Sequence, residues 1–201
     1  MDFYVNGEKI DITIESEKTV SDILKSFEAE AAKNEATTIG IKVNGEKIPA
    51  EEFDSLMHKP LEETQSIELN VLSKASLIDA LKSSKSAFVE LEGKLKEVPV
   101  LLQGGKEKEA NAIIADFANN IDEFCHNVTM SALFPELYSS ILIDGKAVSD
   151  FFEEFAPIIA DFEQSMQTKD SVTSGDLCEY EIAPRLGIIA AAIDQCISNL
   201  P

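Results

Sequence analysis

The spacing of apolar residues along the chain changes near residue 73, from alternation to a helical period. The first alternating runs contain Phe3 and Val5, then Ile10, Ile12 and Ile14, with Asn6-Gly7 between them. Asn-Gly between two alternating runs is a strong hairpin signal, because both turn residues of a type I′ turn need positive φ. We therefore predict that the chain begins with two strands joined by a tight turn.

A helix and three further strands are expected before residue 73. Thr19 to Asp22 has the spacing of a capping box, and apolar residues then follow at helical intervals to about Asn34. Alternation returns from Ile39 to Val43, a second Asn-Gly occupies 44–45, and Ile67, Leu69 and Val71 close the segment. The predicted order is strand, strand, helix, strand, short strand, strand.

From Ser76 onward the pattern predicts four amphipathic helices in an up-and-down bundle. Their apolar positions are Leu77, Leu81, Ser84, Phe88, Leu91, Leu95, Val98 and Leu102; Ala110, Ile113, Ile114, Phe117, Ile121, Phe124 and Val128; Phe151, Phe152, Phe155, Ile158, Ile159, Phe162 and Met166; and Ile182, Leu186, Ile189, Ile193 and Ile197. Gln103 to Lys106 should end the first helix and connect it to the second. Residues 133–145 could contain a short additional helical turn. Pro157 and Pro184 fall inside the third and fourth patterns and should kink or interrupt them.

The first third of the chain resembles the ubiquitin-like β-grasp superfamily. The resemblance rests on the opening hairpin FYVNGEKIDITIE, the helix TVSDILKSF, the hairpin IGIKVNGEKIPAEEF and the final strand SIELNVL. It implies an α+β protein: a ubiquitin-like β-grasp domain over residues 1–73, followed by a four-helix bundle over 74–201. The family's sulfur carriers end in Gly-Gly, whereas the only Gly-Gly here, Gly104-Gly105, lies between two predicted helices. Carrier chemistry is therefore not expected, and neither is the family's apolar recognition patch, because Lys42 stands at its centre.

Charge narrows the classes of partner. The 201 residues contain 17 basic and 37 acidic side chains, a net charge of −20. Binding to nucleic acid or to anionic membranes needs clustered Lys and Arg, so neither is expected. Apolar runs fall short of a membrane span, and the N-terminal sequence lacks the features of a signal peptide. With three unpaired Cys, these features predict a cytoplasmic protein.

Catalytic and metal-binding patterns are weak. Glu123 and His126 form a Glu-x-x-His, but a di-iron bundle needs a second such motif on another helix. Adjacent helical residues such as Cys125 and His126 diverge by about 100°, so they do not readily share a metal, and Cys125, Cys178 and Cys196 are expected in or beside the core. Gly-x-Ser-x-Gly and phosphate-loop motifs are not found. We therefore predict a non-enzyme with no cofactor and no metal.

The charge is unevenly distributed. Residues 109–201 contain 16 acidic and three basic residues, net −13, whereas residues 74–108 carry net +2. The Lys residues of the first bundle helix are expected to pair with acidic neighbours at little gain in stability. An acidic surface on the later helices would suit a basic partner. The candidate partner-binding residues are Glu153, Glu154, Asp161, Glu163, Glu179 and Glu181.

The function that fits best is a protein-binding adaptor or assembly factor for a partner with a basic or amphipathic surface. One alternative is a chaperone, in secretion or appendage assembly, that holds an amphipathic client in a groove near Pro157 and Pro184. Another is an enzyme or ligand binder with a cavity at those kinks, using Cys178, Glu179, Tyr180 and Glu181. Homodimerisation is a further alternative, through the Phe-rich third helix or the sheet edge that contains Phe3.

Overall fold

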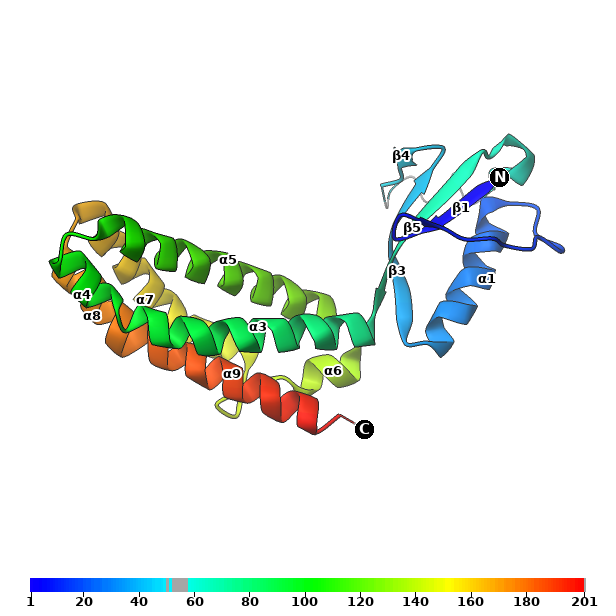
Figure 1. Cartoon of the computed structure of the whole chain (residues 1–201). Helices are drawn as coiled ribbons and strands as arrows, with labels where there is room; N and C mark the ends of the chain where they lie inside the picture. The colour runs from blue at the N-terminus through cyan, green and yellow to red at the C-terminus, as the bar shows by residue number, and fades with distance from the viewer. Residues whose placement is uncertain (50, 52–57, 201) are drawn as a thin grey trace. The chain divides into compact units, whose positions relative to one another are not determined.

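The computed structural model describes residues 1–49, 51 and 58–200, and it divides the chain into two compact units, Met1–Ser76 and Leu77–Pro201. The first is built around a five-stranded sheet and the second is mainly helical, which confirms the predicted α+β class (Figure 1). Most of the last residues quoted for the second hairpin, at 50, 52 and 53, lie outside the described residues.

The N-terminal unit has the predicted order of elements. They are β1 (Asp2–Val5), β2 (Glu8–Lys9), α1 (Val20–Lys33), β3 (Ala36–Val43), β4 (Glu46–Lys47), a 3₁₀ turn (Leu61–Glu63) and β5 (Ser66–Ser73). The strand order in the sheet is β2-β1-β5-β3-β4. β1 runs parallel to the central β5, and β3 runs antiparallel to it.

Both Asn-Gly turns are as expected, and both are tied to β5. Asn6 and Asn44 have φ values of 51° and 53°, and the glycines that follow have 84° and 83°. The Asn6 side chain accepts a hydrogen bond from Val71 N–H at 2.8 Å and donates to the Val71 carbonyl at 3.0 Å. The Asn44 side chain accepts from Gln65 N–H at 2.7 Å. The two turn amides therefore hold opposite ends of the same central strand.

Helix α1 covers the apolar face of the sheet. Thr19 is its N-cap, and the Asp22 side chain completes the capping box by accepting from Thr19 N–H. The helix ends at the C-cap Asn34, as the sequence predicted. Its apolar residues join the strands in one core of Phe3, Val20, Ile23, Leu24, Val43, Ile67 and Leu69.

The second predicted strand is much shorter than expected. β2 stops at Lys9, opposite Tyr4 of β1, and a backbone hydrogen bond from Ile10 N–H to the Phe3 carbonyl follows it. Ile10 and Ile14 are 42% and 44% exposed, while Ile12 packs against the core. The prediction of a strand through residues 10–14 was therefore wrong.

The helical unit contains four long rods with shorter elements between them (Figure 1). Its elements are α3 (Lys74–Leu95), α4 (Val98–Gln103), α5 (Glu107–Ser131), α6 (Pro135–Ser140), β6 (Leu142–Ile143), β7 (Lys146–Ala147), α7 (Val148–Thr168), α8 (Ser171–Asp176), a π-helical segment (Leu177–Ile182) and α9 (Ala183–Ser198). The extra turn expected within 133–145 is α6. The β6–β7 hairpin, which turns at Asp144-Gly145, was not predicted.

The first of the four rods, made of α3 and α4, buries the predicted apolar residues. Leu77, Leu81, Ser84, Phe88, Leu91, Leu95 and Val98 are all buried, and Leu102 is half-buried. The rod is not one helix to Leu102, however. α3 ends at Leu95, and Pro99 lies in the first turn of the separate helix α4, where its missing N–H costs little.

The fourth rod comprises α8, the π-helical segment and α9, in that order. The π-helical segment ends two residues before Pro184. Two glycines of this rod lie close to residues of the first rod. A Cβ at Gly175 would lie 3.0 Å from both Cα and Cβ of Pro99 in α4, and a Cβ at Gly187 would lie 2.6 Å from Oε2 of Glu92 in α3. The fourth predicted helix, which Pro184 was expected to kink or interrupt, thus consists of α8, the π-helical segment and α9.

None of the helices in the described part of the chain combines the length and apolar character needed to span a bilayer.

Candidate functional site

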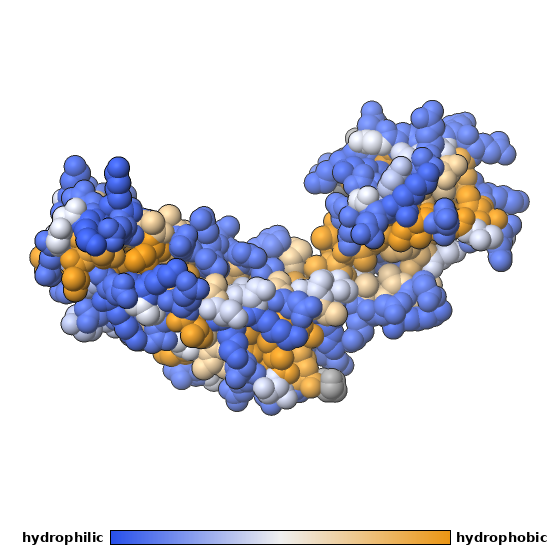
Figure 2. Space-filling model, viewed as in Figure 1, coloured by the Kyte–Doolittle hydropathy of each residue, from blue (hydrophilic) through white to orange (hydrophobic). Residues whose placement is uncertain are grey.

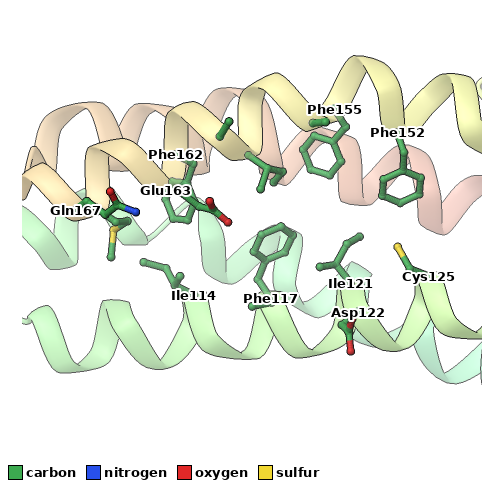
Figure 3. A pocket seen from close by; sticks show the side chains of 15 residues that line it. Ile114, Phe117, Ile121, Asp122, Cys125, Phe152, Phe155, Phe162, Glu163 and Gln167 are labelled. Carbon is green, nitrogen blue, oxygen red and sulfur yellow. The ribbon is translucent and has the colours of Figure 1, made fainter.

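A long apolar groove of about 870 Å³ runs between α5 and α7 (Figure 3). The side chains that line it are Ile114, Phe117, Ala118, Ile121, Asp122 and Cys125 from α5, and Phe152, Phe155, Ala156, Ile159, Ala160, Phe162, Glu163, Met166 and Gln167 from α7. Ile114 lies at the end of the groove near Gln167, and Cys125 lies at the end near Phe152, so the two helices run antiparallel along it. We refer to this feature as the α5–α7 groove.

The groove is formed by residues that the sequence assigned to the core. Phe117, Phe155 and Phe162 are buried and form its floor. Ile114, Ile121, Phe152, Ile159 and Met166 are only half-buried and line its walls. The exposed Ala118, Ala156 and Ala160 keep it wide, because their side chains end at Cβ. Figure 2 shows apolar surface among charged side chains on the face of the helical unit that is turned to the viewer.

An aromatic cluster fixes the end of the groove at Phe152. Phe152 stacks at 6.4 Å from Phe124, which in turn meets the buried Phe88 edge-on at 5.5 Å between ring centroids. Phe155 lies 6.2 Å from Phe152, and the Arg185 guanidinium sits 5.8 Å from the Phe155 ring. These rings join α3, α5 and α7, so this end of the groove is held by packed core.

The charged side chains that line the groove are both acidic, Asp122 and Glu163. Both are exposed, and neither forms a salt bridge within the described residues. Cys125 lies one turn beyond Ile121, and burial, with a smaller contribution from Asp122, raises the pKa of its thiol. The groove therefore presents an apolar surface with two unneutralised carboxylates and the thiol of Cys125.

Of the six acidic residues proposed from the sequence, one, Glu163, lines the groove. Glu154 is paired with Lys146 at 2.7 Å and Glu181 with Arg185 at 2.6 Å. Glu153 and Asp161 are exposed on other sides of α7, and Glu179 lies in the π-helical segment, where it hydrogen-bonds Tyr180 and raises the pKa of that phenol.

Two Lys residues of α3 pair within their own helix: Lys82 with Asp79 and Lys94 with Glu90, each one turn away. Lys96, just beyond the end of α3, pairs with Glu92. Lys85 crosses to Asp194 on α9. The acidic residues of the later helices are therefore neutralised to only a small extent by α3.

The residues weighed as metal ligands or nucleophiles are spread over the helical unit. Glu123 and His126 are exposed on α5, whereas Cys178 and Cys196 are buried. Burial raises the pKa of Cys178 to about 12, and Cys196 Sγ lies 3.0 Å from the Ser140 hydroxyl. Across the described ranges, no three His, Cys, Asp or Glu side chains are grouped as metal ligands would be.

The solvent face of the N-terminal sheet is polar. Glu68 on β5 lies between Tyr4 on β1 and Lys42 on β3, and Lys42 is paired with Glu68 at 2.9 Å. Gly40 and Asn70 are neighbours on the same face. From Lys42, the sequence predicted that this face lacks an apolar recognition patch.

Both units match known families. Residues 1–73 match the TP0873 N-terminal domain, and residues 79–191 match the domain of unknown function DUF8042. The chain is 30% identical over 184 residues to an uncharacterized protein of Treponema pallidum (strain Nichols), and the alignment covers 92% of each chain. No solved structure matches the chain. By its helical unit and this relative, the chain belongs to the DUF8042 family.

Proposed function

We propose that the chain is a non-catalytic protein-binding adaptor or assembly factor whose helical unit receives one amphipathic helix of a partner protein in the α5–α7 groove. The observation that carries this proposal is the groove itself: two antiparallel helices line it with apolar side chains that they leave half-buried. Apolar surface gathered in one concave site is typical of interaction sites. Recognition of a helix in such a groove is a recurrent binding mode.

The length of the groove suits a helix of about four turns. Its lining on α7 extends from Phe152 to Gln167. At 1.5 Å per residue this distance is about 22 Å, which a partner helix of about 15 residues would span. Apolar residues at i, i+3, i+4 and i+7 on that helix would pack against the floor formed by Phe117, Phe155 and Phe162.

The charge of the groove favours Lys or Arg beside the partner's apolar stripe. Asp122 and Glu163 offer carboxylates that basic residues of a partner can pair with. The net charge of −13 over residues 109–201 would also attract a basic partner from a distance. A second copy of the chain would bring the same acidic surface, so like-charge repulsion opposes a symmetric dimer through this groove.

A designed peptide tests the proposal. The probe is an amphipathic helix of about 16 residues with Leu on one face and Lys flanking it. Its controls are a peptide with Glu in place of Lys and one with the Leu positions scrambled. We expect the Lys-flanked probe to bind the full chain with micromolar affinity, to weaken with salt, and to bind at least about tenfold better than either control.

Variants locate the site. Ala156→Gln should weaken binding at least about tenfold, because its side chain would occupy the groove from an exposed helical position. Ala115→Gln is the matched control, since Ala115 is also exposed on a long helix but does not line the groove. Circular dichroism would verify that both variants fold. No binding of the Lys-flanked probe, or equal loss in both variants, would refute the proposal.

We also infer that the N-terminal unit is a ubiquitin-like β-grasp domain. This inference is supported by the strand order, by parallel pairing of β1 with β5, and by α1 between the two hairpins. Its polar face around Lys42 and Glu68 argues for a partner other than one that reads an apolar patch. An experimental structure of residues 1–76 with a different strand order would exclude it.

A cytoplasmic location is a further proposal, supported by the free thiols of Cys125, Cys178 and Cys196. Fractionation of the source cells that recovers the protein in another compartment would overturn it.

A further inference from the structure

A second pocket, lined mainly by polar residues and called the polar pocket below, lies beside one end of the α5–α7 groove. This pocket of about 230 Å³ is lined by Leu102, Glu107, Asn111, Met166, Lys169, Ser171 and Ser174. Met166 lines both cavities, so the two are adjacent at the end of α7. The opposite end of the groove is formed by Phe152 and Cys125, with the Asp122 carboxylate near Cys125 (Figure 3). The site therefore has two chemically different ends.

The polar pocket carries hydrogen-bond donors. Lys169 is the left-handed C-cap of α7, with φ 57°, and is exposed. Of the three basic residues in 109–201, Lys146 and Arg185 are held in salt bridges, while Lys169 is in none within the described part of the chain. Asn111 and Ser171 add an amide and a hydroxyl to the same pocket. Three side-chain donors thus meet where the apolar lining ends.

A helix needs donors at its C-terminus, because its last four carbonyls have no partner within the helix. These carbonyls also carry the negative end of the helix dipole, which favours a cation nearby. Glu107, the acidic residue in the polar pocket, could pair with a Lys or Arg in the last turn of the partner helix, where a basic residue is favourable. The N-terminus of a helix, which presents N–H groups and positive dipole, would instead meet the Lys169 cation unfavourably.

We infer that the partner helix docks in one direction, with its C-terminus in the polar pocket at Lys169 and its N-terminus at the end formed by Cys125 and Phe152. The inference rests on the proposed function of the groove. The bound helix would run parallel to α7 and antiparallel to α5. The partner is thereby described further: a helix of about four turns with an apolar stripe, basic flanks, and a basic residue in its last turn.

Cys125 provides a native test of direction. Cys125 and Asn111 are 14 residues apart on α5, about 21 Å along its axis, so a thiol at one end of a bound peptide can reach Cys125 only from one end. Two versions of the Lys-flanked probe, both capped at their termini, would carry a single Cys at the N- or the C-terminus as a mixed disulfide with thionitrobenzoate. The Cys125 thiolate attacks the peptide sulfur, the old disulfide breaks, and thionitrobenzoate leaves with the electron pair.

We expect the two probes to bind equally and the N-terminal Cys to be captured at least about tenfold faster than the C-terminal Cys. Cys125→Ser should abolish capture, since Cys178 and Cys196 are buried. Lys169→Ala should weaken binding severalfold and reduce the preference between the probes. Lys108→Ala is its control, because Lys108 is exposed nearby on α5 and does not line the pocket.

The outcomes separate the two proposals. If the probes bind but are captured equally, or the C-terminal Cys reacts faster, the direction is wrong while the groove remains a binding site. If neither probe binds, the proposed function fails and the direction falls with it. Equal effects of the two Lys variants would also overturn the assignment of the partner C-terminus to Lys169.

Discussion

Two helical glycines make a matched test of how tightly the fourth rod packs. Gly175 is buried in α8, whereas Gly93 lies in α3, where an added Cβ would have nothing within 4 Å. Alanine at either position gains about 0.8–1.0 kcal/mol of helix propensity over glycine. The two variants therefore differ only in what the added Cβ meets.

At Gly175 the added Cβ would lie 3.0 Å from both Cα and Cβ of Pro99, where ordinary contact begins at 3.4 Å. A proline ring cannot rotate out of the way, so α4 and α8 must separate by several tenths of an ångström. Overpacking of this kind costs about 1–3 kcal/mol. We expect Gly93→Ala to raise the free energy of unfolding of the helical unit by about 1 kcal/mol. The free energy of unfolding of Gly175→Ala should be about 1–3 kcal/mol lower than that of Gly93→Ala.

Thermal unfolding followed by far-ultraviolet circular dichroism and by calorimetry would measure this difference on the full chain. At about 2–4 °C per kcal/mol for a chain of this size, the two midpoints should differ by roughly 2–12 °C. A Gly175→Ala variant as stable as Gly93→Ala would refute the close packing of α8 on α4.

Four further predictions concern the cap of α1, the pH dependence that Asp22 contributes, the aromatic core and the thiols. Thr19→Ala should destabilise the N-terminal unit by about 1 kcal/mol in urea titration, because it removes the N-cap of α1. Hydrogen bonds from Lys18 N–H, then from the Thr19 hydroxyl and N–H, hold the pKa of Asp22 below its ordinary value. The stability that the ionised Asp22 carboxylate contributes is complete above the unfolded pKa of about 3.9 and is lost as the pH falls through the lower folded pKa. The stability of Asp22→Asn should therefore fall less steeply than that of the unchanged protein as the pH is lowered. Phe88→Ala should cost about 3–5 kcal/mol, since its ring is fully buried against Phe124, and a loss under 1 kcal/mol in the same titration would contradict this packing. Native alkylation followed by mass spectrometry should modify Cys125 well before Cys178, whose pKa burial raises to about 12; equal rates would be inconsistent with the buried position of Cys178.

Local signals predicted much of the fold. The capping box at Thr19 and Asp22 and the apolar seam from Leu77 to Val98 appear in the structure as the sequence indicated. The strand expected at residues 10–14 failed for a non-local reason: alternation was present, but the pairing of β1 with β2 ends at Tyr4 and Lys9. The fourth rod contains a π-helical segment just before Pro184, which has no N–H to donate. The spacing of apolar residues does not show how the rod packs around such an interruption.

The groove could be predicted only in part. The sequence identified the apolar stripes of α5 and α7, but an apolar residue that faces a core and one that faces a partner have the same spacing. The small residues Ala118, Ala156 and Ala160, which border the stripes and leave the groove open, were the available signal. Charge led to six acidic residues, of which Glu163 lines the groove, because net charge does not specify which side of a helix a carboxylate occupies.

The π-helical segment determines which side of the fourth rod each of its glycines occupies. In an uninterrupted α-helix, Gly175 and Gly187, twelve residues apart, would point about 120° away from each other. A π-helical turn accommodates one extra residue, which reduces the angle between the two glycines by about 100°. Both glycines then lie on nearly the same side of the rod. That side is the one that meets Pro99 and Glu92 of the first rod. Length is thus critical within Leu177–Ile182: removing a single residue there would rotate α9 relative to α8 by a quarter turn or more, so this short stretch should tolerate exchanges of side chain far better than a change in the number of residues.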